Sequence, residues 1–155
     1  MQTRAFGKTG LNPSVIGFGM MRMPKDEQGK FDVRWSIDTL RYAIDHGLSY
    51  VDTAYAYGDS ERIVGLCLQD GYREKVTLAS KMPVSRMTCE EDFDRILNEE
   101  LERLQTDHID VYLLHALGKE SYAKAQSFKA FEFAAQKKAE GRHYLAGSCY
   151  VYYPD

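Results

Sequence analysis

The stretch Val51-Asp52-Thr53-Ala54-Tyr55-Ala56-Tyr57-Gly58-Asp59-Ser60-Glu61 decides the fold of this chain. It continues a short apolar run at residues 48–51, which is typical of a buried β-strand. Asp59 and Ser60 are residues of the kind that cap helices, and apolar positions on helical spacing follow: Ile63, Val64 and Cys67. The stretch is therefore predicted to be a strand-to-helix loop. In α/β proteins with parallel strands, such loops usually carry the chemistry.

Two later β-type runs end in residues that can do chemistry. Residues 75–81 end in Lys81, and residues 109–115 end in His115. The steps from Asp52 to Lys81 and from Lys81 to His115 each suit one βα unit of roughly 30 residues. The carboxyl ends of these three strands are thus predicted to bring an acid, a lysine and a histidine to one rim, with Tyr57 between the first two.

This set of four residues resembles the active site of the aldo-keto reductase family. The resemblance covers residues 2 to about 145 and implies a (β/α)8 barrel of the TIM type. It also implies a catalytic set, Asp52, Tyr57, Lys81 and His115. A complete barrel takes about 250 residues. We therefore expect an α/β chain of 155 residues to form a truncated barrel, with an N-terminal β-hairpin and the first four to five βα units.

We expect residues 1–155 to form a single partial barrel domain. Residues 1–16 are predicted to hold the hairpin and the start of a first strand at residues 14–19, residues 17–141 the βα units, and residues 142–155 an irregular fifth-strand region and tail. Asp32 is predicted to cap the first helix. Residues 88–91 have the form of a capping box for the third helix. A loop at residues 116–122 is expected to lead into one helical stretch to Ala139.

The resemblance implies NADP(H) as the cofactor. The positions it suggests for cofactor binding are Gly19, Met20, Met21, Asp52 and Ser148. The two methionines are at least as well explained by core or rim packing. The sequence has Leu-Ala-Gly-Ser at residues 145–148 where the family often has Ile-Gly-Phe-Ser, so it departs from the pattern just before Ser148. It has no GxGxxG, HExxH or paired-cysteine motif, so we expect no metal site.

Carbonyl reduction needs a hydride at carbon and a proton at oxygen. Tyr57 can supply the proton, but an ordinary phenol has a pKa of about 10 and is a poor acid near neutrality. The resemblance implies that Lys81 lowers that pKa, and the physical reason is that a nearby ammonium stabilises the phenolate. Asp52 would keep the lysine charged and His115 would hydrogen-bond the carbonyl.

Each residue also has a simpler interpretation when it is taken alone. A lysine after a strand is usually solvated, and an aspartate often caps a turn. His115 can satisfy a backbone carbonyl, and Tyr57 can pack beside Tyr55, which is also the rival phenol. Only the combination of the four residue types at strand ends favours the enzyme.

Composition excludes several classes of partner. The net charge is −3 and basic residues are spread along the chain, so neither nucleic acid nor an anionic membrane is favoured. No apolar run approaches the roughly 20 residues that span a bilayer, and the amino terminus lacks the apolar core of a signal peptide. The three cysteines, Cys67, Cys89 and Cys149, follow no metal-ligand pattern. We therefore expect a cytoplasmic protein.

Two functions remain open at this point. The first is an NADP(H)-dependent oxidoreductase that reduces a small aldehyde or ketone, with Tyr57 as the general acid. The alternative is a non-catalytic truncated half-barrel, or a regulatory or interaction module of the same family. An open barrel would expose an unpaired strand edge and its inner face, which predicts self-association.

Overall fold

The computed structural model describes the backbone of residues 1–150 and their side chains, apart from those of residues 144–146, 148 and 150. Five strands form one parallel sheet in chain order. The strands are β1 (Phe18–Gly19), β2 (Tyr50–Asp52), β3 (Thr77–Met82), β4 (Ile109–Leu117) and β5 (His143–Tyr150). The helices are α1 (Val33–Asp45), α2 (Ser60–Cys67), α3 (Glu91–Leu104), α4 (Lys119–Ser127) and α5 (Ala130–Ala139).

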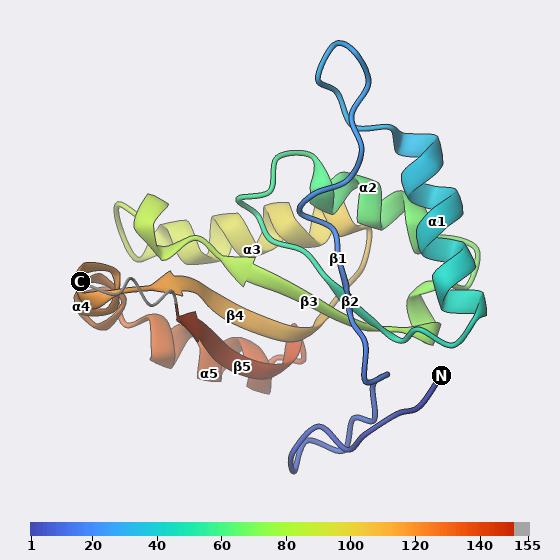
Figure 1. The fold of residues 1–155 in the computed structure, drawn as a ribbon. Coiled ribbons are helices and arrows are strands. Elements are labelled where there is room, and N and C mark those ends of the chain that lie inside the picture. Colours follow the sequence, from blue (N-terminus) through green and yellow to red (C-terminus); the bar gives the residue numbers. More distant parts are fainter. Residues whose placement is uncertain (151–155) are drawn as a thin grey trace.

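Strands and helices alternate along the chain, and the helices lie around one side of the curved sheet (Figure 1). The register aligns the carboxyl ends of the strands, because Gly19 pairs with Asp52 and Asp52 with Ala79. Lys81 then pairs with Leu113, two residues before His115. This order of parallel strands confirms the expected barrel-type α/β fold, and it brings the three strand ends to one rim.

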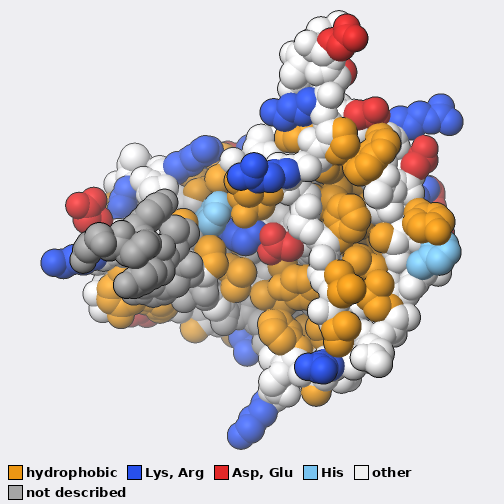
Figure 2. Space-filling model, in the orientation of Figure 1, with side chains coloured by type: hydrophobic (Ala, Val, Ile, Leu, Met, Phe, Trp, Pro, Cys, Tyr) orange, Lys and Arg blue, Asp and Glu red, His pale blue; other side chains and the backbone are white. Residues whose placement is uncertain are grey.

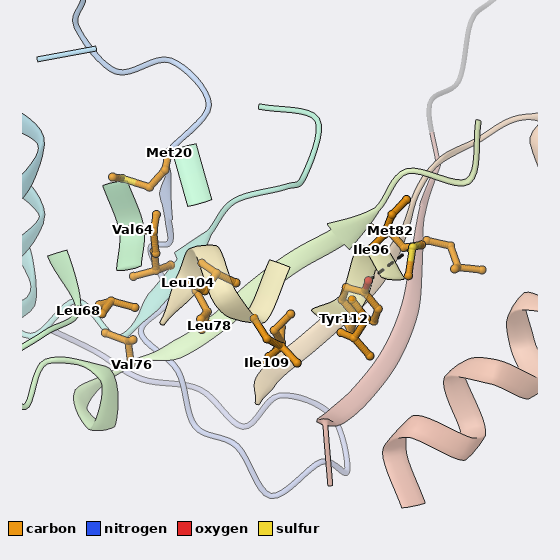
Figure 3. Close-up of a cluster of buried hydrophobic side chains, with 14 of the residues drawn as sticks. Met20, Val64, Leu68, Val76, Leu78, Met82, Ile96, Leu104, Ile109 and Tyr112 are labelled. Carbon is orange, nitrogen blue, oxygen red and sulfur yellow. Dashed lines mark hydrogen bonds between the residues drawn. The ribbon is translucent and has the colours of Figure 1, made fainter. Parts of the chain in front are cut away.

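The hydrophobic core lies between the sheet and the helices. Leu78 of β3, Val64 of α2 and Leu104 of α3 are almost completely buried in it (Figure 3). Gly65 allows α2 to approach α3 closely, because a Cβ at this position would lie 2.5 Å from the carbonyl oxygen of Arg103. Burial of these side chains is the main source of stability for the helix layer.

The hairpin at the amino terminus is pinned by one antiparallel bridge, between Thr3 and Ser14. Ser14 pairs with Thr3 in this hairpin, and the side chains of Val15 and Ile16 are 45% and 58% exposed. The first barrel strand is therefore shorter than expected. It consists of Phe18 and Gly19 rather than residues 14–19.

The cap of the first helix is confirmed, whereas that of the third is not. Asp32 Oδ1 accepts a hydrogen bond from the backbone N–H of Trp35 at the start of α1. The capping box expected at residues 88–91 is wrong: Glu90 is the N-cap residue and makes no side-chain capping hydrogen bond, while Asp92 in the first turn reaches back to Thr88. Asp92 Oδ2 accepts from the backbone N–H of Thr88 and from the Thr88 hydroxyl, both at 2.7 Å. A carboxylate one residue later in the first turn reaches both donors at once.

The chain after β4 also differs from expectation. Helix α4 begins at Lys119, inside the expected loop, and the single helical stretch is divided at Lys129, which has a φ of 55°. A residue in the left-handed region interrupts the helical hydrogen-bond ladder. Residues 143–150 form the regular strand β5 in place of the irregular region expected there, and residues 151–155 lie outside the described part. Within the described part, no helix is long and apolar enough to cross a membrane.

Candidate active site

Lys81 is held in the centre of the rim by two oxygens. Its Nζ donates hydrogen bonds to Asp52 Oδ1 at 2.6 Å and to the carbonyl oxygen of Thr53 at 2.7 Å. The Lys81 side chain is 7% exposed and that of Asp52 is 29% exposed. A buried ammonium needs such a partner, because desolvation of an unpaired charge is costly. These bonds use two of the three Lys81 N–H donors.

Tyr57 lies beside this ion pair. The centre of its ring is 4.7 Å from Lys81 Nζ and 5.6 Å from the centre of the His115 ring, which it meets edge to face at 82°. The loop that carries Tyr57 is a tight turn, because the Tyr57 N–H donates to the Ala54 carbonyl and Gly58 has a φ of 62°. The four side chains expected to meet at the rim therefore do so.

The start of α2 fixes this loop to the strand before it. The Ser60 hydroxyl donates to the carbonyl oxygen of Met20 and lies 2.8 Å from the Thr53 hydroxyl. Asp59 is the N-cap residue of α2, as its position in the sequence predicts, but its side chain makes no capping hydrogen bond. Ser60 rather than Asp59 is therefore the residue whose side chain anchors the loop.

His115 lies next to a β-bulge. Leu114 pairs with Ser148 and Leu117 with Tyr150, so β4 contains one extra residue at this point. Ala116, directly after His115, has a φ of 51°. Bulges of this kind re-aim side chains next to active sites. Burial lowers the pKa of His115, and the Lys81 charge lowers it further, so the imidazole is neutral at neutral pH.

The rival phenol points elsewhere. The hydroxyl of Tyr55 donates to Glu99 Oε2 at 2.7 Å, and the guanidinium of Arg103 lies 4.2 Å from the centre of the Tyr55 ring. Glu99 and Arg103 both belong to α3. Tyr55 is thus bound to the helix layer, and Tyr57 is the phenol that faces Lys81.

The residues expected to bind the cofactor differ in their burial and in their contacts. The Met20 side chain is completely buried in the core, which favours the packing interpretation of this methionine. Met21 is 51% exposed, and the space beside Gly19 is open, with no atom within 4 Å of an added Cβ. Asp52 is engaged by Lys81, and the Ser148 side chain lies outside the described part.

One charged residue near the site was not expected from the sequence. Arg86, in the loop after β3, is exposed, and its charge contributes to the lowered pKa of His115. No motif in the sequence indicates this proximity, because it depends on how the loop folds over the rim.

A cavity of about 550 Å³ lies beside the chain segment that follows His115. It is lined by Ser85, Ala116, Gly118, Lys119, Glu120, Ser121 and Lys124. Figure 2 shows, on the side where β1 and β2 lie, hydrophobic side chains gathered at the surface. Among the residues that the structure describes, no group of three or more histidine, cysteine or acidic side chains is placed to hold a metal ion.

Comparison with known proteins gives a consistent result. The sequence model described as the Aldo/keto reductase family matches residues 15–147. Aldo-keto reductase YhdN of Bacillus subtilis is 36% identical over 125 residues, which cover 74% of this chain and 38% of the relative. A putative aldo-keto reductase structure from Pseudomonas aeruginosa superposes with a TM-score of 0.82 at 30% identity, covering 96% of this chain and 60% of that one. An aldo-keto reductase from Klebsiella pneumoniae, solved in complex with NADPH, gives 0.74 at 29% identity and covers 97% of this chain and 50% of that one. The chain thus spans only part of the length of these relatives.

Proposed function

Because this chain belongs to the aldo/keto reductase family, we propose that it carries the catalytic residues of an NADP(H)-dependent oxidoreductase that reduces a small aldehyde or ketone. The observation that supports this most directly is the contact between Lys81 and Tyr57, 4.7 Å from Nζ to the ring centre, beside His115. The NADPH-bound relative from Klebsiella pneumoniae supports the choice of cofactor.

In the proposed reaction Tyr57 donates its phenolic proton to the carbonyl oxygen. The Lys81 ammonium stabilises the negative charge that develops on the Tyr57 oxygen, and Asp52 holds the ammonium in place. Neutral His115 donates an N–H to the same carbonyl oxygen and aligns it. When bound, NADPH supplies the hydride that reaches the carbonyl carbon.

The residues present fit a nicotinamide cofactor at the rim. The open space beside the Gly19 backbone admits a close approach, and Met21 offers an exposed apolar surface next to it. We propose Gly19, Met21, Asp52 and Ser148 as the residues that contact it. The Met20 backbone contributes only indirectly, because its N–H donates to the Asp52 carbonyl and its own carbonyl accepts from Ser60.

A titration of the purified chain with NADPH, followed by fluorescence, tests this proposal. The solution mass is measured on the same sample, because the chain spans only part of its relatives. Saturable binding in the micromolar range supports the proposal. Gly19→Val should weaken it at least tenfold without unfolding the chain, since the added side chain enters open space. The absence of binding by a folded sample would refute the claim that this chain alone builds a cofactor site.

The alternative proposal is a non-catalytic module of the same family that associates with itself. It is favoured by the open sheet, whose outer strands are β1 and β5, and by the exposed Val15, Ile16 and Met21 near β1. The two proposals separate in the same experiment. A stable dimer that does not bind NADPH supports the module, and saturable NADPH binding supports the enzyme. The three cysteines are free thiols, which favours a cytoplasmic location for either.

A further inference from the structure

A buried cluster of polar side chains lies behind β3, on the face opposite Lys81. Ser80 is its centre: its hydroxyl lies 2.7 Å from Glu61 Oε1 of α2 and 3.0 Å from Glu100 Oε1 of α3. Glu61, Ser80 and Glu100 are completely buried. Tyr112 of β4 donates its hydroxyl to Glu100 Oε2, and Arg103 donates to Glu61 Oε2 at 3.4 Å. Four elements thus converge on two carboxyl groups.

The number of hydrogens in this cluster is informative. A serine hydroxyl has one proton and can donate to one acceptor, yet the Ser80 hydroxyl lies within hydrogen-bond distance of an oxygen from each carboxyl group. If both carboxyl groups were ionised, one of these contacts would join two oxygens with no proton between them. The geometry therefore requires a proton on one of the two glutamates.

The surroundings decide which glutamate carries it. Glu61 faces the Arg103 guanidinium, which stabilises the ionised form. Glu100 faces the neutral hydroxyls of Ser80 and Tyr112 and the carboxyl group of Glu61, and no cation among the described residues is paired with it. Burial raises the pKa of Glu100, and the negative charge of Glu61 raises it further. Burial also raises the pKa of Glu61, but Arg103 opposes the effect there.

The other charged groups around the cluster do not change this assignment. Glu99 of α3 is bonded to Tyr55, Arg95 and Arg103, and it sits towards the surface. From β5, the ring of His143 lies 5.6 Å from that of Tyr112, and burial lowers its pKa, so it is neutral. Arg62 of α2 is exposed. Glu100 therefore remains the neutral member of the pair.

The cluster is connected to Lys81 through two adjacent pairs of residues. Ser80 and Lys81 are neighbours on β3, so their side chains point to opposite faces of the sheet. Ser60 and Glu61 are neighbours at the start of α2. Glu61 binds Ser80 on one face, while Ser60 binds Thr53, whose carbonyl accepts from Lys81 on the other. The first turn of α2 is therefore linked to Ser80 directly and to Lys81 through Thr53.

We propose that Glu61 and Glu100 share one proton through Ser80, and that this buried acid pair is a positioning device that fixes Lys81 in the candidate active site. The proposal deepens the proposed function and rests on it for the role of Lys81. Glu100 donates to the Ser80 oxygen, and Ser80 donates to ionised Glu61, which is neutralised by Arg103. Every polar group then has a partner of the right kind.

The proposal predicts a specific dependence of stability on pH. Because the pKa of Glu100 is higher in the folded chain than in the unfolded one, the folded chain binds more protons above the unfolded value, close to pH 4.5. The free energy of unfolding must therefore fall as the pH rises from that value towards the folded pKa. Each unit of difference between the two pKa values corresponds to about a tenfold change in the unfolding equilibrium constant.

Urea unfolding from pH 5 to pH 9 tests the shared proton in the whole chain without cofactor. Relative to Glu100→Gln, the wild type should lose stability as the pH rises, by about tenfold or more in the equilibrium constant. The lowered pKa values of His115 and His143 act in the opposite direction below about pH 6.5, but equally in both proteins. Glu100→Gln keeps a neutral donor and should remove this fall, whereas Glu61→Gln, which leaves Arg103 without its buried anion, should lower stability throughout. Glu99→Gln, on the same helix, is the control and should keep the wild-type slope.

The NMR signal of the Lys81 ¹⁵Nζ tests the positioning. Glu100→Ala should shift this signal and Glu100→Gln should restore it, because only the latter rebuilds the bond to Ser80. An unchanged slope in Glu100→Gln, or a Lys81 signal that is the same in all variants, would overturn the proposal. Both measurements are made without NADPH, so a failure of cofactor binding would leave their outcome intact and would count against the proposed function alone.

Discussion

The Lys81 ammonium lies 4.7 Å from the centre of the Tyr57 ring while it is hydrogen-bonded to Asp52 Oδ1. A cation at this distance from an aromatic ring is attracted to it by about 1–2 kcal/mol. The contact therefore holds the phenol and the ammonium together before any substrate arrives. This arrangement is the basis of the first three predictions.

Tyr57→Phe should slow carbonyl reduction severely and leave the fold intact. It removes the proposed proton donor, which should lower the rate by about 10²–10⁴-fold. The matched control is Tyr55→Phe. It breaks the bond to Glu99, should cost about 1 kcal/mol of stability and should leave the rate unchanged. Rates of aldehyde reduction and urea midpoints of both variants check this, and equal loss of activity in both would contradict the assignment of Tyr57.

Lys81→Met should destabilise the chain, because it leaves the partly buried Asp52 carboxylate without its cation. Loss of one member of a buried pair costs about 3–5 kcal/mol, and the 29% exposure of Asp52 places this case near the lower end. The double variant Lys81→Met, Asp52→Asn should recover much of the loss. Urea unfolding measures both, and a double variant no more stable than the single one would show that the ion pair is not the cause.

The pKa of His115 should lie below 6.5 and should rise in Lys81→Met. Burial is the largest cause of the lowered pKa and the Lys81 charge is the second, so removal of the Lys81 charge should raise the pKa of His115. Because folded His115 binds a proton less readily than unfolded histidine, the stability that His115 contributes should be lost as the pH falls below about 6.5. Titration of the His115 ring by NMR checks this, with Lys8→Met at an exposed position as the control. A lower His115 pKa in Lys81→Met would refute the assigned charge effect.

Gly65→Ala should destabilise the packing of α2 on α3. A Cβ at this position would lie 2.5 Å from the Arg103 carbonyl oxygen, so backbone must move, at a cost of about 1–3 kcal/mol. Gly118→Ala is the matched control, because no atom lies within 4 Å of its added Cβ and its φ of −112° suits any residue. Thermal unfolding compares the two. Equal stability would mean that the contact between the helices is looser than the structure indicates.

Much of the fold could be predicted from the sequence because local signals agree with it. The strand, turn and cap residues around Asp52 and Tyr57 define a strand-to-helix loop whatever the rest of the chain does. The spacing then places Lys81 one βα unit after Asp52, and His115 one βα unit after Lys81. These features depend on the spacing of apolar residues and on residue type, both of which can be read along the chain.

The rest depends on contacts between distant residues. Thr88 does not form the expected capping box because Asp92 reaches two donors of Thr88 at once. Met20 is a core residue because the start of α2 packs over it, which no local pattern indicates. The proton shared by Glu61 and Glu100 arises from two helices meeting behind one serine. Burial that depends on tertiary contacts is not encoded in a window of neighbouring residues.

The extra residue in β4 reverses the alternation of side chains along this strand. In a regular strand, residues two positions apart point to the same face, so Leu117 would share the face of His115. With the bulge between Leu114 and Leu117, Leu117 is instead 1% exposed and belongs to the same core cluster as Leu114. β4 thus carries His115 at the rim, while Leu114 before it and Leu117 after it both pack in the core. Removal of Ala116 would leave a regular strand in which Leu117 directly follows His115 and still points to the core.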